Sequence, residues 1–173
     1  MFVTGVLSAM DQTIVGTALP KIVSQLRGYD IYAWVFASYY LGATATATVV
    51  GRLSDLFGRK RIIVLSVGVF TVGSLLCGAA QTMPAMVAFR GLQGVGAGGV
   101  ATTNLAIIGD LFSPRERGKW QAVNSLAFAT ASAIGPVVGG IISDTISWRW
   151  IFFSNLPLAA AAMVAMIYAL PKL

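Results

Sequence analysis

The chain has 173 residues, of which 57% are hydrophobic and only 10% are charged. Soluble domains carry about 25% charged residues, so this chain lacks the polar surface that a soluble enzyme or binding module needs. It contains no histidine and one cysteine, Cys77, which excludes imidazole catalysis, a zinc cluster and an internal disulfide. The composition therefore indicates a membrane protein, and we expect no metal site.

Six segments are long and apolar enough to cross the membrane, which takes about 20 residues per helix. We therefore predict an all-α transmembrane six-helix bundle that forms a single domain over residues 1–173. Pro20 is predicted to end the first span, and Gly58 to separate the second from the third. The predicted spans are 2–19, 32–50, 62–80, 85–108, 122–142 and 151–170.

The basic residues fall in short clusters between these spans, so we interpret the net charge of +6 through membrane topology and not through nucleic-acid binding. Lys21, Arg27 and Arg149 lie on one predicted side. The larger group on the other side comprises Arg52, Arg59, Lys60, Arg61, Arg115, Arg117, Lys119 and Lys172. This bias places the even-numbered loops and both termini in the cytoplasm.

Two charged residues lie deep within predicted spans, Asp11 in the first and Arg90 in the fourth. A charge at this depth usually faces a cavity, forms an ion pair or takes up a proton. At 1.5 Å per residue the two lie within about 5 Å of the same depth, so we predict that they pair if their helices are adjacent. A structural aspartate, and an arginine that extends outward to the headgroups, remain the alternatives.

Small residues are concentrated in two spans. Within 90–99, the glycines Gly91, Gly94 and Gly98 fall at helical spacing and permit close approach of another helix, and Gln93 lies beside Arg90. The Gly-x-Gly-x-x-Gly-like spacing lies inside a span and does not follow a strand, which excludes a dinucleotide site. The segment 135–140 combines glycines with Pro136, which predicts a kink or a pliable contact surface; close packing alone is the alternative.

The segment 51–61 between the second and third spans is more structured than a charge bias requires. Asp55 can accept a hydrogen bond from Arg59 or from a neighbouring helix end, and Gly58 permits a tight turn. Taken alone, these residues fit a topogenic charge cluster and a cytoplasmic latch equally well.

Aromatic residues recur at helical spacing in the second span, at Tyr32, Phe36 and Tyr39. Such a stripe can line a cavity for cations or face the lipid, and the spacing does not choose between the two. The candidate substrate-cavity residues are Thr13, Phe36, Tyr39, Asn104 and Asn124.

Together these motifs resemble the major facilitator superfamily, and within it the fourteen-helix drug:proton antiporter branch. Residues 10–20 are similar to the first-helix signature of that branch, with Gly16 and Thr17 where Asn and Val are usual, and 148–157 is similar to the start of its sixth helix. The other matching positions are Gly51, Leu53, Asp55, Gly58, Arg59 and Lys60 in the loop motif, Arg90, Gln93, Gly94 and Gly96 in the fourth-helix motif, and Gly135, Pro136, Gly139 and Gly140 in the antiporter motif, whose leading glycine is Ala131 here.

The resemblance implies half of a major facilitator fold, made of two inverted three-helix repeats, in a proton-driven exporter of lipophilic, often cationic compounds. It assigns Asp11 and Arg90 to proton coupling, Asp55 and Arg59 to a cytoplasmic gate, and 135–140 to antiport and leak prevention. The implied location is the cell (inner) membrane. The implied partners are the lipid bilayer, protons, a small lipophilic or cationic substrate and a second six-helix half, with the proton gradient in place of a cofactor.

Such transporters contain two six-helix bundles, and this sequence supplies one. We therefore expect an N-terminal fragment or a truncated reading frame, with a homodimer of halves as the alternative. A membrane interaction protein that does not transport is a further alternative. A channel is less expected because the sequence shows no selectivity loop, and an enzyme is not expected because there is neither histidine nor a Gly-x-Ser-x-Gly nucleophile.

Overall fold

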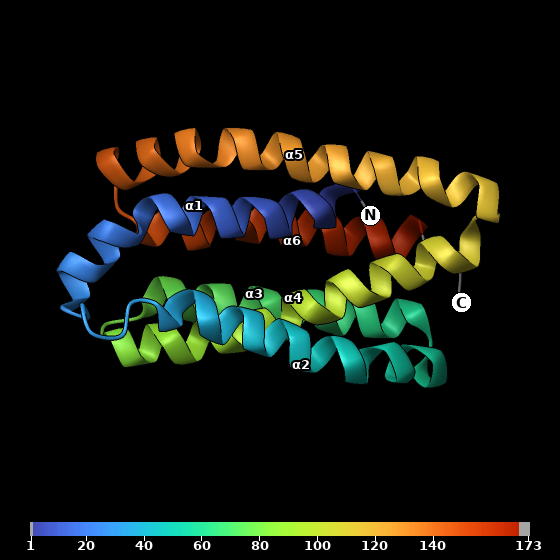
Figure 1. Ribbon diagram of the computed structural model, residues 1–173, viewed down its shortest axis with the longest axis horizontal. Coiled ribbons are helices and arrows are strands. Elements are labelled where there is room, and N and C mark those ends of the chain that lie inside the picture. Colours follow the sequence, from blue (N-terminus) through green and yellow to red (C-terminus); the bar gives the residue numbers. More distant parts are fainter. Residues whose placement is uncertain (1, 170–173) are drawn as a thin grey trace.

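The computed structural model describes residues 2–169, without the side chains of 2–5, 8 and 169. This part of the chain forms six helices and no strand, which confirms the predicted all-α bundle (Figure 1). The helices are α1 (Phe2–Leu26), α2 (Trp34–Phe57), α3 (Arg59–Ala79), α4 (Met83–Leu111), α5 (Pro114–Thr145) and α6 (Arg149–Ala169). Lys172 and the last residue of the sixth predicted span, at 170, lie outside the described residues.

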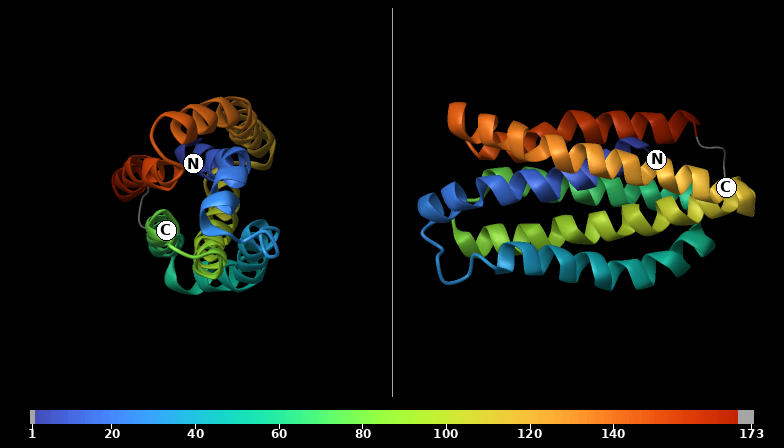
Figure 2. Two further views of the ribbon diagram at one scale, coloured as in Figure 1. Left: turned by 90° about the vertical axis from the view of Figure 1, so that its left-hand side faces the viewer. Right: turned by 45° about the horizontal axis from the view of Figure 1, so that its top comes forward.

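The six helices run alongside one another in two groups, α1 with α5 and α6, and α2 with α3 and α4 (Figures 1 and 2). Helix α4 packs mainly on α2 and α3, α1 packs mainly on α5, and α3 also contacts α6. The first helix of each predicted three-helix repeat thus packs on the second helix of the other repeat. This exchange is the contact pattern that two interlocked repeats produce.

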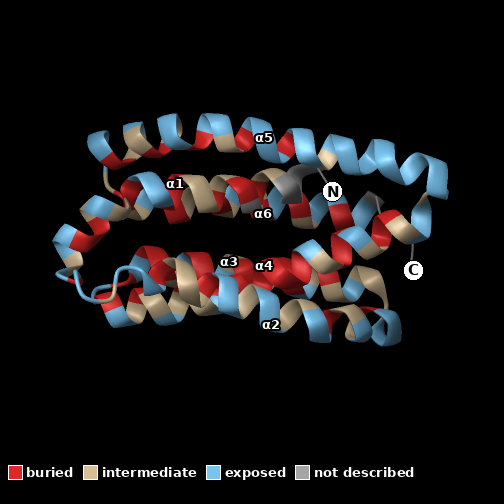
Figure 3. Cartoon of the chain, viewed as in Figure 1, coloured by how far each residue is buried: buried red, intermediate tan, exposed pale blue. Residues whose placement is uncertain are grey.

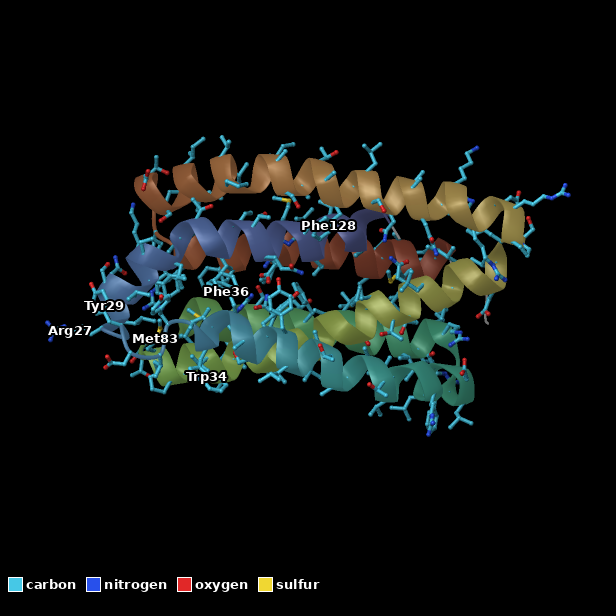
Figure 4. All side chains as sticks on the ribbon, in the orientation of Figure 1. Arg27, Tyr29, Trp34, Phe36, Met83 and Phe128 are labelled. Carbon is cyan, nitrogen blue, oxygen red and sulfur yellow. The ribbon has the colours of Figure 1, made fainter. Side chains whose placement is uncertain are left out.

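The prediction that Pro20 ends the first helix is wrong, because α1 continues to Leu26 with Pro20 inside it. A proline removes only its own N–H from the hydrogen-bond ladder, and neighbouring helices compensate for that loss in a bundle. The helix ends instead at Arg27, whose φ of 51° is left-handed, and the N–H of Gly28 donates to the carbonyl of Val23. This hydrogen bond defines a Schellman-type helix end. Figure 4 shows that Arg27 lies at the same end of the bundle as Met83.

The prediction for Gly58 is confirmed. Gly58 alone separates α2 from α3, and its φ of 90° is a conformation that side chains other than glycine rarely adopt. The break between the helices is therefore shorter than the predicted loop, and Arg59 already belongs to α3.

Three of the described helices have the length and apolar composition of a membrane span, namely α3, α5 and Arg149–Tyr168 of α6. Polar and small residues interrupt the apolar sequences of α2 and α4. The structure turns many of those residues inward, and α4 is the most buried helix in Figure 3, whereas the outer face of α5 is exposed. The predicted spans thus include three apolar helices, and α4 combines its span with buried polar residues.

Two apolar clusters form the core, and the polar site lies between them. On α1, Ile14 belongs to the first cluster and Leu7 to the second; on α4, Met86 belongs to the first and Ala97 to the second. Asp11 lies between the two on α1, and Arg90 lies correspondingly on α4. Apolar packing on both sides thus separates this pair from the two ends of the bundle.

Candidate functional site

Asp11 and Arg90 form a fully buried ion pair. Arg90 Nη1 lies 2.7 Å from Asp11 Oδ2, and both side chains are 0% exposed. The predicted pairing is confirmed, and the alternative in which Arg90 extends outward to the headgroups is excluded. Because removing two charges from water costs several kcal/mol per ion, such a pair persists only when further hydrogen bonds satisfy it.

Two amide side chains supply those hydrogen bonds. Gln93 Nε2 and Asn155 Nδ2 each donate to Asp11 Oδ1 at 2.8 Å, and Gln93 Oε1 accepts from Arg90 Nη1 at 2.8 Å. Three N–H donors from α4 and α6 therefore converge on one carboxylate. This arrangement stabilises the ionised form of Asp11, which can only accept hydrogen bonds.

The Arg90 guanidinium is also held from α2. It lies over the Tyr39 ring, 4.3 Å from the ring centroid, and its Nε lies 3.5 Å from the carbonyl oxygen of Val35. Its Nη2 has no hydrogen-bond partner within the described part of the chain. The predicted aromatic stripe is therefore split: Tyr39 is buried, Phe36 extends toward α1 in Figure 4, and Tyr32 is exposed.

Glycines of the fourth-helix motif bring α2 and α3 close enough to build this site. A Cβ on Gly94 would overlap the backbone of Tyr39 on α2, and a Cβ on Gly96 would overlap the backbone of Phe70 on α3. Only glycine permits these approaches. The predicted close packing is confirmed at Gly94 and at Gly98, where a Cβ would overlap the backbone of Ala43, but not at Gly91, where a Cβ would make only ordinary contacts. The motif places Tyr39 directly over Arg90.

The antiporter motif lies where α5 packs against α1. A Cβ on Gly135 would overlap the hydroxyl of Thr13, and a Cβ on Gly139 would lie 3.1 Å from the Cα of Ile14. Helix α5 continues through Pro136, and Gly140 has more room. Thr13 is thus covered by α5, and the role of the motif in antiport stays a prediction.

The residues of the predicted latch meet at one end of the bundle. Arg59 pairs with Asp55 at 2.5 Å and with Asp110, at the end of α4, at 2.8 Å, and it also contacts the Ser54 hydroxyl. Gly51 lies on the same stretch of α2, beside Thr102 of α4. Sequence reasoning missed Asp110, because an acid just beyond a predicted span carries no further signal.

The predicted cavity residues do not form one site. Asn104 is buried on α4 about 21 Å along the helix from Arg90, and the Oδ1 atoms of Asn104 and Asn124 have no partner among the described residues. An open cavity of about 310 Å³ borders Tyr39, whose ring lies against Arg90, although neither Asp11 nor Arg90 lines the cavity. It is lined by Gln12, Tyr39, Tyr40, Ala43, Thr44, Ala47, Ala97, Gly98, Ala101 and Thr102.

Tyr39 is the one predicted cavity residue that lines this cavity. Sequence reasoning missed Gln12, which lines the cavity and whose Oε1 accepts a hydrogen bond from the Tyr40 hydroxyl at 3.0 Å. It also missed Asn155, although that residue lies within the segment 148–157 that matched a family motif.

Two interlocked three-helix repeats around a buried ion pair define one half of a secondary transporter of the membrane. The family model described as "Major Facilitator Superfamily" matches residues 1–172. The chain belongs to this superfamily, and is therefore an integral membrane protein of a transporter family.

The chain is similar to named multidrug proteins over nearly its whole length. It is 44% identical over 161 residues to Multidrug resistance protein 3 of Bacillus subtilis, covering 93% of this chain and 31% of that protein. It is 40% identical over 169 residues to the Multidrug transporter protein MdtP of the same organism, covering 95% and 31%. The chain thus spans about 31% of the length of these relatives.

Solved structures show the same fold. The inward-open xylose transporter XylE from E. coli matches with a TM-score of 0.81 and 18% identity, over 99% of this chain and 46% of that one. The human organic anion transporter MFSD10 matches with a TM-score of 0.77 and 21% identity. At these identities the likeness establishes half of a major facilitator fold and no substrate.

Proposed function

We propose that this chain acts as the N-terminal half of a proton-coupled exporter of lipophilic and cationic compounds. It works by alternating access in the cell membrane, with both termini in the cytoplasm and a second six-helix half as partner. The observation that carries the proposal is the fully buried Asp11–Arg90 pair at 2.7 Å. The names of the multidrug relatives support the substrate class.

Charge balance explains how a proton drives movement. With Asp11 ionised, the pair is neutral and stable in its apolar surroundings. A proton on Asp11 leaves Arg90 as an uncompensated buried cation, and losing one partner of a buried pair costs about 3–5 kcal/mol. The protonated protein therefore favours a conformation in which Arg90 is hydrated or newly paired, and this links proton binding to the conformational equilibrium.

A cationic substrate competes with the proton for the same carboxylate. The cavity lined by Tyr39 and Gln12 is separated from the ion pair by the Tyr39 ring, and it has mainly apolar walls with a few polar groups, which suits a lipophilic cation. In the proposed cycle Asp11 balances either a proton or the positive charge of the substrate, but not both. Proton entry from outside then expels the substrate.

The Arg59 cluster acts in the proposal as the cytoplasmic gate. Arg59 joins the end of α2, the start of α3 and the end of α4 through Asp55 and Asp110. These contacts keep the cytoplasmic ends of three helices together, so that they move as a unit against the second half.

The test is efflux of a fluorescent cation from vesicles under a pH gradient, using the complete gene product that carries this chain. We expect Asp11→Asn to abolish proton-driven efflux, whereas the matched control Asp30→Asn, at an exposed turn residue, keeps it. Unchanged efflux in Asp11→Asn would contradict the proposal. Efflux by vesicles that contain this chain alone would show a homodimer of halves in place of the proposed partner.

A further inference from the structure

Helix α6 contributes a polar side chain to the buried ion pair, although α6 carries no charge near it. Asn155 is 2% exposed, and its Nδ2 lies 2.8 Å from Asp11 Oδ1 and 3.1 Å from the Oγ of Ser74 on α3. Ser74 is 0% exposed, and its hydroxyl donates to the carbonyl of Phe152 at 2.9 Å. Asn155 and Ser74 thus form a hydrogen-bonded relay from Asp11 to the backbone of α6.

The direction of these hydrogen bonds is determined by the donor inventory. Ser74 uses its single hydrogen on the Phe152 carbonyl, so its Oγ accepts from Asn155. The Asn155 amide therefore directs both N–H groups outward, one to Ser74 and one to Asp11. This polarity suits an ionised carboxylate.

A protonated Asp11 needs the opposite polarity, because its O–H group requires an acceptor. Arg90 offers only donors, and the Oε1 of Gln93 already accepts from Arg90. Asn155 can provide the acceptor if its amide rotates so that Oδ1 faces Asp11. The Ser74 hydroxyl then turns from Phe152 to donate to the same Oδ1.

We propose that Asn155 and Ser74 form a proton-sensing relay that positions Asp11 and reverses its hydrogen-bond direction when Asp11 takes up a proton. The proton stays on Asp11, and only hydrogen bonds change. Because the relay connects α3 with α6, it carries the protonation state of Asp11 to the contact between the two three-helix repeats. The inference rests on the proposed function in taking Asp11 as the group that exchanges the proton.

Few other titratable groups face Asp11. Arg90 faces it from α4, Tyr39 from α2, and Cys77 lies on α3 within contact of Gln93. Residues 2–20 of α1 contain no second titratable side chain, and the spanning parts of α5 and α6, 122–143 and 151–167, contain none. Asp11 is thus the one carboxyl group of the spanning segments, which makes its titration separable from that of the surface acids.

The test is an infrared titration of the full chain in lipid nanodiscs. Protonated Asp11 is identified as the carboxyl C=O band that is absent in Asp11→Asn. Asn155→Ala removes the N–H donor from the charged form of Asp11 and the acceptor from the protonated form. Because a hydrogen bond to a charged group is about twice as strong as a neutral one, the charged form loses more, and we expect the titration midpoint to move upward by about one pH unit.

Ser74→Ala should move the midpoint in the same direction by a smaller amount, and Ser74→Thr, which keeps the hydroxyl, should move it back. Ser66→Ala is the matched control, because Ser66 is also buried on α3 but bonds to Ile62 of its own helix. Where Asn155→Ala fails to fold, the two Ser74 variants provide the test.

Titration midpoints equal to wild type in Asn155→Ala and Ser74→Ala would overturn the relay. A shift in Ser66→Ala as large as that in Ser74→Ala would also overturn it, as would the absence of a titrating Asp11 band in the wild-type chain. The proposed function fails separately. If the midpoint shifts in the Asn155 and Ser74 variants but the protein shows no substrate-driven proton flux, the exporter is refuted and the relay stands. If Asp11→Asn abolishes transport but the midpoint does not shift in those variants, the exporter stands and the relay is refuted.

Discussion

The Asp11–Arg90 pair predicts a strong non-additivity in stability. Both side chains are fully buried, and Nη1 and Oδ2 are 2.7 Å apart. At an effective dielectric constant of about 20, two unit charges 4 Å apart attract by about 4 kcal/mol. This agrees with the loss of about 3–5 kcal/mol that follows removal of one partner from a buried pair.

We therefore expect Asp11→Asn and Arg90→Gln each to lower the free energy of unfolding by about 3–5 kcal/mol. The double variant should cost less than either single one, because it leaves no unpaired charge in the core. The assay is denaturant unfolding of the chain in mixed micelles, followed by far-UV circular dichroism. Single-variant losses that simply add up in the double variant would refute the reasoning.

Two further predictions concern packing and the gate. Gly94→Ala should destabilise the bundle by about 1–3 kcal/mol in the same unfolding assay, because its Cβ would meet the Tyr39 backbone. The control Gly109→Ala should be neutral or stabilising, because nothing lies within 4 Å of that Cβ. Equal effects of the two substitutions would contradict the close α2–α4 contact. Arg59→Gln should change stability by at most about 1 kcal/mol, since Asp110 is 42% exposed, yet should lower the efflux rate in vesicles. An unchanged efflux rate would remove Arg59 from the gate.

The sequence predicted the features that depend on local chemistry. Apolar length gave the number of helices, and the depth of Asp11 and Arg90 in their spans gave the ion pair. The end of α1 was predicted wrongly because proline was treated as a terminator, whereas the bundle tolerates Pro20 and the left-handed Arg27 ends the helix. Helix ends of this kind depend on tertiary packing.

The residues that sequence reasoning missed all act through contacts between distant segments. Asn155 lies 144 positions from Asp11 along the chain, and Asp110 lies 51 positions from Arg59. Asp110 has no local pattern that distinguishes it from an ordinary polar residue near the end of a helix, and the motif match over 148–157 did not indicate that Asn155 faces Asp11. The sequence of a span does not show which neighbour a polar residue faces, and neither Asn104 nor Asn124 lines the cavity next to Tyr39.

Mutual exclusion of a proton and a cationic substrate at Asp11 is the step on which the proposed transport cycle depends. Its most direct measurement is proton release from the purified complete gene product, in weakly buffered detergent solution, when a cationic substrate is added. We predict that substrate binding releases protons from the wild-type protein and that Asp11→Asn releases none. Substrate binding without proton release in the wild type, or equal release in Asp11→Asn, would contradict it.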